Sequence, residues 1–322
     1  MSIFTRLLAV LLLATAGAAA GQSYPTRPLA ILNGFPPGGA TDIVLRRVAA
    51  KLSLSLGQQV VIENRPGAAG TIAAGAVARA APDGYTLLFG VAANLAVAPA
   101  TMRNPPYDPA GAFSPIIEVS RGPYVWLVRS DVLAKDLKEF IDWLRSNPGR
   151  ANYASPGQGS VHHLATEMLK RSTGAQMTHV PYKGGFAMAA ALLSGEVQGM
   201  FDSPPAHLAN IHAGKLRALA VTGSRRLASL PDVPTLGEQG LPELDVHSWW
   251  GFVGPAGLPR SIVTRLNAEI ASALADPELK ATFTKLNVDA TPGTPEEFGR
   301  FIAQESARWR QFVATSGLKL GQ

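Results

Sequence analysis

The sequence predicts an α/β protein of two domains, each built on a mostly parallel sheet flanked by helices. Short apolar segments rich in Val, Leu and Ile alternate along the chain with longer Ala- and Leu-rich segments of helical periodicity. Such alternation predicts parallel strands joined by helices that cover both faces of a sheet. The 322 residues exceed the ~150 typical of one domain. A content of 47% apolar and 16% charged residues is typical of a compact folded chain.

The elements are expected in a regular order over the first two thirds of the chain. Apolar runs predict strands at residues 29–33, 59–63, 85–90, 124–129, 151–155, 177–180, 197–202 and 216–222. Helical patterns lie between them at residues 42–56, 68–80, 135–147, 161–172, 186–194 and 206–213. The C-terminal third is different, with helices expected at residues 260–275, 277–286 and 295–316 and strands only at 250–253 and 288–290. Pro295 followed by two glutamates suits a helix start, because acids stabilise the positive end of a helix.

The N-terminus has the order of segments typical of a secretory signal peptide. The basic residue Arg6 precedes an apolar run at residues 7–14, and Ala18-Ala19-Ala20 offers a small-residue cleavage site. The apolar run is too short to span a bilayer. We therefore expect residues 1–20 to be cleaved and the mature protein to be exported to the periplasm.

Cysteine usage and charge narrow the class of protein further. The sequence contains no cysteine, so its stability must come from a packed core, and a lipid anchor on cysteine is excluded. The net charge of +6 is dispersed, without a long basic run or an aromatic and basic stripe, so we expect no nucleic-acid partner.

Two loops that follow predicted strands resemble one another. Residues 34–42 and 156–160 each combine proline, two glycines and a hydroxyl residue directly before a helix. A helix start offers unpaired N–H groups and a partial positive charge, which together attract anions. The alternative is that Thr41, Asp42 and Ser160 only cap their own helices. Because there are two matched loops, we favour a site that holds a carboxylate between them without any arginine.

Other kinds of site have weaker support in the sequence. No Gly-Lys-Ser/Thr phosphate loop is present, and residues 157–162 lack the third glycine of a dinucleotide fingerprint. Ser160, His163 and Asp202 could be imagined as a hydrolase triad, but the Gly-x-Ser-x-Gly elbow is missing. His163 and Glu167 could share a zinc ion, but no further ligand cluster supports them. We therefore expect no catalytic activity, no cofactor and no metal.

Several motifs in register resemble one family along essentially the whole mature chain. They are Gly34-Phe35-Pro36-Pro37-Gly38-Gly39-Ala40-Thr41-Asp42, residues 57–68, residues 81–88, Tyr153-Ala154-Ser155, Gly159-Ser160, His179-Val180-Pro181-Tyr182-Lys183-Gly184, residues 214–220 and residues 230–235. Their order and spacing resemble the Bug family, the periplasmic solute-binding proteins of tripartite tricarboxylate transporters.

The resemblance implies a type II-like periplasmic binding protein with two domains and a ligand in the cleft between them. The first domain would be discontinuous, with residues 22–122 plus 241–322, and the second would comprise residues 123–240. The implied function is to capture a small organic acid and deliver it to the membrane components of a tripartite tricarboxylate transporter, as a monomer. The alternative that stays open is a ligand-sensing periplasmic protein that signals to a membrane receptor.

The resemblance also implies ligand-binding residues. The first turn supplies Phe35, Gly38, Gly39, Thr41 and Asp42, the second supplies Ser155, Gly159 and Ser160, and further cleft loops supply Asn94, Tyr182, Lys183 and Asp202. Beside an anion, Asp42 is expected to cap its helix or hold a bridging water instead of touching the ligand. For His163, a capping or hinge role and ligand contact both stay open.

One segment departs from the family pattern. The chain reads Val91-Ala92-Ala93-Asn94 after a predicted strand, with Asn94 where Ser or Thr is common. The more apolar surroundings favour a ligand whose distal part is less polar than citrate. Trp249 and Trp250 could line the same cleft, although aromatic pairs at a strand more often belong to the core.

Overall fold

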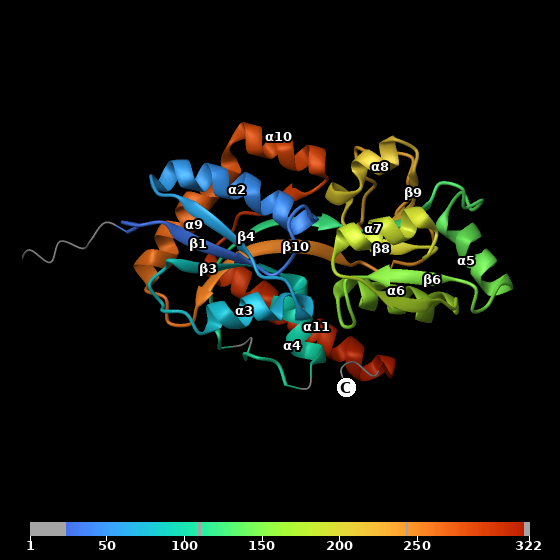
Figure 1. The fold of residues 1–322 in the computed structure, drawn as a ribbon, viewed down its shortest axis with the longest axis horizontal. Coiled ribbons are helices and arrows are strands. Elements are labelled where there is room, and N and C mark those ends of the chain that lie inside the picture. The colour runs from blue at the N-terminus through green and yellow to red at the C-terminus, as the bar shows by residue number, and fades with distance from the viewer. Residues whose placement is uncertain (1–23, 103, 109–110, 243, 319–322) are drawn as a thin grey trace, which may run out of the picture.

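A computed structural model describes residues 24–102, 104–108, 111–242 and 244–318. The predicted signal peptide, residues 1–20, lies outside the described residues. Within the described ranges, no helix combines the length and the apolar character needed to cross a membrane. The elements form two units that lie side by side in Figure 1, with the blue, orange and red segments in one and the green and yellow segments in the other.

The first unit is a sheet between two layers of helices. Its strands are β1 (Leu29–Asn33), β2 (Val60–Asn64), β3 (Thr86–Val91), β4 (Phe113–Pro123), β10 (His247–Pro255) and β11 (Asp289–Ala290), in the order β11-β4-β10-β3-β1-β2. Its helices are α2 (Ala40–Leu56), α3 (Thr71–Ala78), α4 (Ala98–Thr101), α9 (Arg260–Ala275), α10 (Pro277–Leu286) and α11 (Pro295–Ser316). The short turns η1 (Ala68–Gly70) and η2 (Ala93–Val97) precede α3 and α4.

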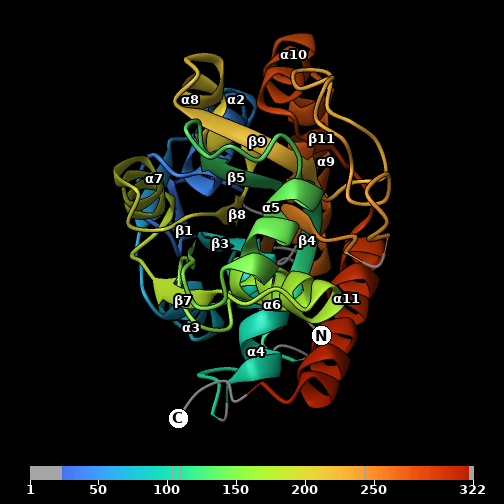
Figure 2. The ribbon, with the colours of Figure 1, turned by 90° about the vertical axis from the view of Figure 1, so that its right-hand side faces the viewer.

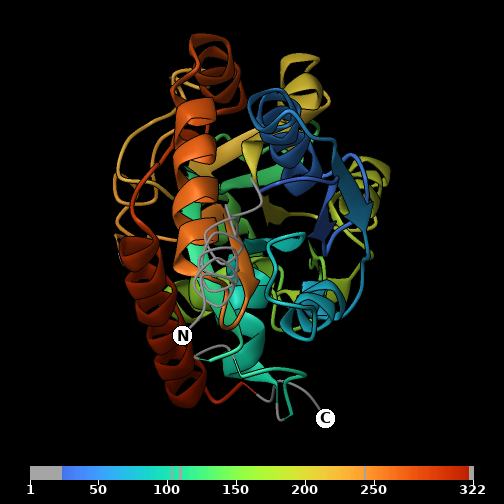
Figure 3. The same ribbon diagram turned by 90° about the vertical axis from the view of Figure 1, so that its left-hand side faces the viewer.

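Alternating side chains on the strands build the two cores of this unit. Leu29 and Ile31 of β1 pack in one cluster with α2, α9 and α10, whereas Leu32 packs in another with α3 and α11. Such alternation is the consequence of a strand's two-residue period. In Figure 1, α2 and α10 accordingly lie above the sheet and α3, α4 and α11 below it. Figure 3 views this unit from its outer end, where the orange and red C-terminal helices line one side.

The second unit is smaller. Its strands are β5 (Val125–Arg129), β6 (Asn152–Ser155), β7 (Thr178–Pro181), β8 (Met200–Asp202) and β9 (Leu216–Val221). Its helices are α5 (Leu137–Ser146), α6 (Val161–Thr173), α7 (Gly185–Ser194) and α8 (Leu208–His212), with the turn η3 (Pro204–Ala206) after β8. Trp126 and Val128 of β5 pack with α5 and α6, while Val125 and Leu127 pack with α7. Figure 2 views this unit end on, with α5 in front.

The α/β fold in two units is confirmed, but the expectation that each sheet is mostly parallel is wrong. In the first sheet β1 pairs in parallel with β2 and β3, whereas the pairs β10–β3, β10–β4 and β11–β4 are antiparallel. In the second unit β6 and β7 are parallel, but β5 pairs antiparallel with both β8 and β9. The reason is the path of the chain. The strands β4 and β10 carry it out of the first unit and back, so as neighbours they must run in opposite directions.

Strand β4 was not expected from the sequence. Its eleven residues include Pro115 and Pro123, which conceal the strand pattern. Pro115 lies opposite Val253, at a register shift between β4 and β10. Such irregularities are where a sheet tolerates proline.

Buried hydrogen bonds tie the two crossing points together. The hydroxyl of Thr222, at the end of β9, accepts a bond of 2.9 Å from the N–H of Tyr124 and donates to the carbonyl of Val246. Ser248 Oγ donates to the carbonyl of Gly122 at 2.9 Å. We propose that these crossings separate the two domains, residues 22–122 plus 241–322 and residues 123–240.

The Thr222 hydroxyl gives a test of this crossing. We expect Thr222→Val to lower the free energy of unfolding by about 1–3 kcal/mol, because a buried donor and a buried acceptor lose their partner. Thr222 is 3% exposed, so water cannot replace the hydroxyl. Urea unfolding followed by circular dichroism measures the change. Thr222→Ser keeps the hydroxyl and is the control; equal stability of the Val and Ser variants would contradict the assignment.

Candidate ligand-binding site

A cavity of about 100 Å³ lies where the two units meet. Residues of the first unit that line it are Phe35, Pro36, Pro37, Gly39, Ala40, Thr41, Ala69, Val91, Ala92, Ala93, Ser248, Trp249 and Trp250. Residues of the second unit that line it are Tyr124, Pro156, Ser160, Val161, His162, Lys183, Gly184, Gly185, Phe186, Met188, Asp202, Ser203 and Ala206. The space is several times that needed for one water molecule, so it can hold a small organic molecule.

The starts of three helices line this cavity. They are Gly39-Ala40-Thr41 of α2, Ser160-Val161-His162 of α6 and Gly184-Gly185-Phe186 of α7. Helices α2 and α7 begin after glycines, and in the described chain neither has a side-chain cap. The first N–H groups of a helix have no partner within it. The cavity therefore collects backbone donors and the positive ends of helix dipoles, which suits an anion.

The first turn is held by Asp42. Its carboxylate accepts hydrogen bonds from the N–H of Gly38 at 3.0 Å, from Nε of Arg46 at 2.7 Å and from Nδ2 of Asn64 at 3.1 Å. Burial by itself would raise the pKa of Asp42, but the bonds from Arg46, Gly38 and Asn64 hold this pKa below its usual value. Asp42 does not line the cavity within the described structure; it fixes the turn, and Arg46 balances its charge.

Thr41 is oriented toward the cavity by an indole from the crossing strand. Its Oγ1 accepts a hydrogen bond of 3.1 Å from Nε1 of Trp250. Because a hydroxyl both accepts and donates, this bond leaves the hydroxyl hydrogen free to donate to a ligand. Trp250 and Trp249 are 2% and 1% exposed and line the cavity, so they belong to the core and to the site at once.

The second turn is stabilised mainly by its own side chains. Ser155 Oγ lies 2.6 Å from Nε2 of His179 and accepts from the N–H of Gly157 at 3.1 Å. Ser160 Oγ donates to the carbonyl of Gly157 at 2.7 Å and accepts from the N–H of His163, so it caps α6. Burial lowers the pKa of His179 to about 4, which keeps this ring neutral near pH 7.

His163 is part of the same turn. Its Nδ1 accepts a hydrogen bond of 3.2 Å from the N–H of Gly159, and burial lowers the pKa of its ring. His163 does not line the cavity within the described residues, which favours the capping role over ligand contact.

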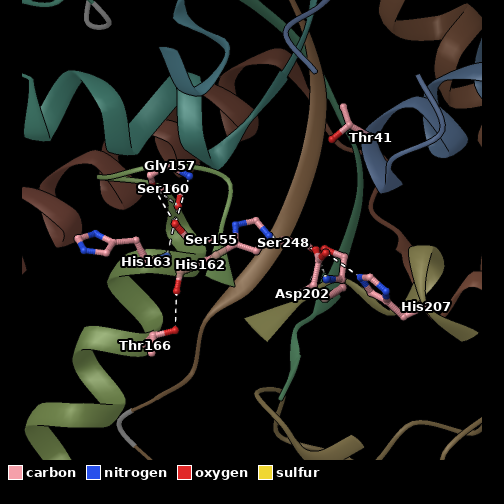
Figure 4. A network of polar contacts seen from close by, with 12 residues as sticks. Thr41, Ser155, Gly157, Ser160, His162, His163, Thr166, Asp202, His207 and Ser248 are labelled. Atoms are coloured by element: carbon pink, nitrogen blue, oxygen red, sulfur yellow. Dashed lines mark hydrogen bonds and ion pairs between the residues drawn. The ribbon is translucent and has the colours of Figure 1, made fainter. Parts of the chain in front are cut away.

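Asp202 is held between two histidines (Figure 4). Its Oδ1 lies 3.1 Å from Nε2 of His162 and its Oδ2 lies 2.7 Å from Nε2 of His207. The N–H of Ser203 donates to Oδ1 at 2.7 Å. Burial would raise the pKa of Asp202, but His207 and His162 together hold it well below its usual range. Asp202 is 5% exposed and lines the cavity, so it is a buried anion at the site.

The structure brings together only half of the residues expected to bind ligand. Phe35, Gly39, Thr41, Ser160, Lys183 and Asp202 line the cavity; Gly38, Asp42, Asn94, Ser155, Gly159 and Tyr182 are not among the described lining residues. Asn94 is fully buried, where its Oδ1 accepts from the N–H of Val91 at 2.8 Å. Burial raises the pKa of Tyr182 to about 12, so its hydroxyl stays protonated.

Sequence reasoning missed His162, Tyr124 and the start of α7. The choice between His162 and His163 depends on helix phase, which the sequence leaves open. Tyr124 lies in no motif and contacts the ring of His162 edge-on at 4.9 Å between centroids. The pair Gly184-Gly185 before a helix repeats the pattern of Gly38-Gly39 and could have signalled a third turn.

The two units are in contact around the cavity. A Cβ atom added to Gly38 would lie 2.9 Å from Cε2 of Phe186, and one added to Gly184 would lie 3.3 Å from Cγ of Pro36. Gly159 likewise faces Thr101 of α4, with 3.0 Å between its added Cβ and Oγ1. The structure is therefore a closed state in which glycines permit close approach.

The structure does not bring together the hydrolase triad or the zinc ligands considered from the sequence. Asp202 contacts His162 and His207 instead of His163, and the Ser160 hydroxyl donates to a carbonyl. Glu167, the other candidate zinc ligand, accepts from Tyr153 Oη and Lys170 Nζ at 2.7 Å each. Among the described residues, no cluster of three His, Cys, Asp or Glu side chains is arranged to hold a metal.

Asp42 gives a pH-dependent test of the first turn. We expect Asp42→Asn to lower the free energy of unfolding by about 1.5–3 kcal/mol near pH 7, because the charged hydrogen bonds are lost. The lowered pKa in the folded state means that this stability is fully present above the unfolded pKa of about 4 and is lost as the pH falls below it, through the lowered pKa of the folded state. Urea unfolding at pH 7, 5 and 3 measures the difference from the unmodified protein.

The exposed Asp142 of α5 supplies a control for this test. Asp142→Asn should change stability by no more than about 0.5 kcal/mol, as for other surface substitutions. A penalty for Asp42→Asn that is constant with pH would contradict the role given to its charge.

Comparison with known proteins identifies a family and relatives that match nearly the whole chain. A model of the tripartite tricarboxylate transporter family receptor matches residues 44–318. The chain is 38% identical over 322 residues to protein BugT of Bordetella pertussis, covering 98% of this chain and 99% of BugT.

Two solved structures are similar over nearly the whole chain. Rpa4515 of R. palustris with adipate has a TM-score of 0.89 and 35% identity, covering 93% of this chain and all of that one. MatC of Rhodopseudomonas palustris with bound malate has a TM-score of 0.85 and 34% identity, covering 90% of this chain and all of that one. The Bug resemblance is thereby confirmed, and the chain belongs to the tripartite tricarboxylate transporter receptor family of periplasmic binding proteins.

Proposed function

We propose that this protein captures a small carboxylate in the cavity between its two units and delivers it to the membrane components of a tripartite tricarboxylate-type transporter. The observation that carries the proposal is the convergence of the starts of α2, α6 and α7 on one cavity. Relatives of similar fold are described with adipate and with malate, which supports a carboxylate as the ligand.

Backbone groups explain how an anion can be held there. Each helix start contributes unpaired N–H donors and roughly half a positive charge. In the described chain, Lys183 is the single Lys or Arg among the lining residues, and it is exposed. Recognition is then carried by N–H groups and by the Thr41 hydroxyl, with Phe35, Gly39, Ser160 and Asp202 shaping the site.

Release follows from opening of the two domains. A carboxylate bound by helices of both units loses the donors of one unit when they separate, and water replaces them. Hinge closure about crossing strands is an established mode of ligand capture. The bonds of Thr222 to both crossings support a hinge next to Tyr124, which also lines the cavity.

A carrier role also implies how the protein treats its ligand, its oligomeric state and its location. The protein binds its ligand without chemical change, acts as a monomer and reaches the periplasm through a cleaved signal peptide. The support for binding without catalysis is that Ser160, the candidate nucleophile, is occupied as a helix cap.

Gly39 allows the site to be blocked with little strain. It has a φ of −75°, and within 4 Å of an added Cβ lies only the carbonyl oxygen of Pro36, at 3.8 Å. We expect Gly39→Val to fill part of the cavity and weaken carboxylate binding at least tenfold, while the free protein still unfolds in one cooperative thermal transition, with at most the modest loss of stability of a poorer helix cap.

Calorimetry and thermal shift with malate, adipate, butanoate and benzoate measure this effect. A ligand at 100 times its Kd stabilises the unmodified protein by about 2.7 kcal/mol, and a variant that binds tenfold more weakly should gain no more than about 1.4 kcal/mol at the same ligand concentration. The control is Gly237→Val, at an exposed glycine outside the cavity lining. Equal affinity of Gly39→Val and the unmodified protein would rule the site out.

A further inference from the structure

We propose that His162 determines which carboxylates the cavity accepts, because its Nδ1 accepts a hydrogen bond from a hydroxyl group of the ligand. This inference rests on the proposed function, since it adds a contact to the ligand of the same cavity. It is carried by the tautomer that Asp202 imposes on His162 and by two buried side-chain atoms of the lining that have no partner in the described structure.

Asp202 fixes which nitrogen of His162 carries a hydrogen. Its two oxygens lie 3.1 Å from Nε2 of His162 and 2.7 Å from Nε2 of His207. Burial would raise the pKa of Asp202, but His207 and His162 hold this pKa well below its usual range, so the carboxylate is ionised and only accepts. Nε2 therefore donates in both rings, and in the neutral form of each ring Nδ1 keeps its lone pair.

The Nδ1 atoms of these two rings differ in their position. Within the described chain both are buried and have no hydrogen-bond partner. His162 lines the cavity and contacts the ring of Tyr124, another lining residue, edge-on. His207 lies on the other side of Asp202 (Figure 4) and is not among the described lining residues. Of the two rings, His162 is therefore the one that can present its unpaired acceptor to a ligand.

A hydroxyl group is the ligand group that suits this acceptor. An ionised carboxylate has no hydrogen to donate to Nδ1, whereas a hydroxyl has one. An ammonium group also donates, but it brings a full positive charge. In the described lining the one acid is Asp202, and both of its oxygens are already paired. Because Nδ1 is buried in the closed state, its partner must be captured with the ligand before the two units close.

Trp249 supplies a complementary donor. Its Nε1 is buried and has no partner among the described residues, and its side chain lines the cavity. The neighbouring Trp250, by contrast, donates from Nε1 to Oγ1 of Thr41. An indole N–H only donates, so Trp249 favours an oxygen of the ligand. A hydroxy acid offers both a donor for His162 and acceptors for Trp249.

The wall after β3 leaves this discrimination to His162 and Trp249. Val91, Ala92 and Ala93 line the cavity and are each at most 8% exposed. Asn94 is fully buried, and its side chain bonds the N–H of Val91 and the carbonyl of Gly70. This wall therefore presents apolar side chains, which supports a ligand that is less polar than citrate.

Acids that differ by one hydroxyl group test this inference directly. Malate is succinate with one hydroxyl, and 2-hydroxybutanoate and 3-hydroxybutanoate are butanoate with one hydroxyl at different positions. Calorimetry on the mature protein gives the affinities. We expect at least one hydroxylated acid to bind at least tenfold more tightly than its parent acid, because a site that bonds a hydroxyl group rejects the analogue that lacks it.

The outcomes separate this inference from the proposed function. If acids bind but no hydroxylated acid reaches that margin, or if aspartate binds more tightly than malate, the inference is overturned and the carboxylate carrier stands. If none of these acids binds, and neither adipate nor benzoate binds, the proposed function itself is overturned.

His162→Gln tests the role of Nδ1. The amide nitrogen of Gln can replace Nε2 as a donor to Asp202, but the acceptor at Nδ1 is removed. We expect the preference for the hydroxylated acid to fall at least fivefold. The control is His207→Gln, which makes the same exchange on the other side of Asp202, outside the described lining, and should leave the preference unchanged. An unchanged preference in a folded His162→Gln protein, or an equal loss in both variants, would overturn the role of His162.

Nitrogen NMR spectroscopy of the histidine rings tests the tautomer without a substitution in the protein under study. The signals of His162 are identified by their loss in His162→Gln. With the tightest-binding hydroxy acid bound, we expect the hydrogen on Nε2 and an unprotonated Nδ1. A ring that carries a hydrogen on Nδ1 would overturn the inference.

Discussion

The structure depends on a constraint of helix geometry: the first N–H groups of a helix have no partner within that helix. Ser160 satisfies one such group at the start of α6, but the residues that precede α2 and α7 are Gly39 and Gly184, which have no side chain to do so. Because these starts border one cavity, their donors face a shared space. A bound anion can accept hydrogen bonds from these N–H donors, and closure of the two units brings the donors together.

The fold supplies the positions of these helix starts. Helix α2 follows β1 in the first unit, whereas α6 and α7 follow β6 and β7 in the second, so the site exists only when the units are closed. The strands β4 and β10 cross between the units as antiparallel neighbours, and Thr222 bonds both crossings. Trp250 of β10 also orients Thr41 and lines the cavity, so the strand that we propose as part of the hinge is also a wall of the site.

Much of the secondary structure could be predicted, because it depends on local pattern. The strand at 29–33 and the three C-terminal helices have the predicted bounds. Strand β4 could not be predicted, since Pro115 is tolerated at an irregular pairing with β10 and Pro123 at the last residue of the strand. The two glycine turns were recognisable from local sequence, whereas the placement of His162, Tyr124 and Phe186 in the cavity depends on helix phase and on contact between the units. Asn94 is likewise fully buried, with a local bond to Val91 and a tertiary bond to Gly70.

The most direct test is a crystal structure of the mature protein with a small carboxylate bound at full occupancy. We expect the carboxylate oxygens to lie within about 3.2 Å of backbone nitrogens at the starts of α2 and α7, with the hydrocarbon part against Ala92 and Trp250. A carboxylate paired with the Lys183 side chain outside the cavity, or a hydrocarbon part that faces solvent, would contradict recognition by the helix starts.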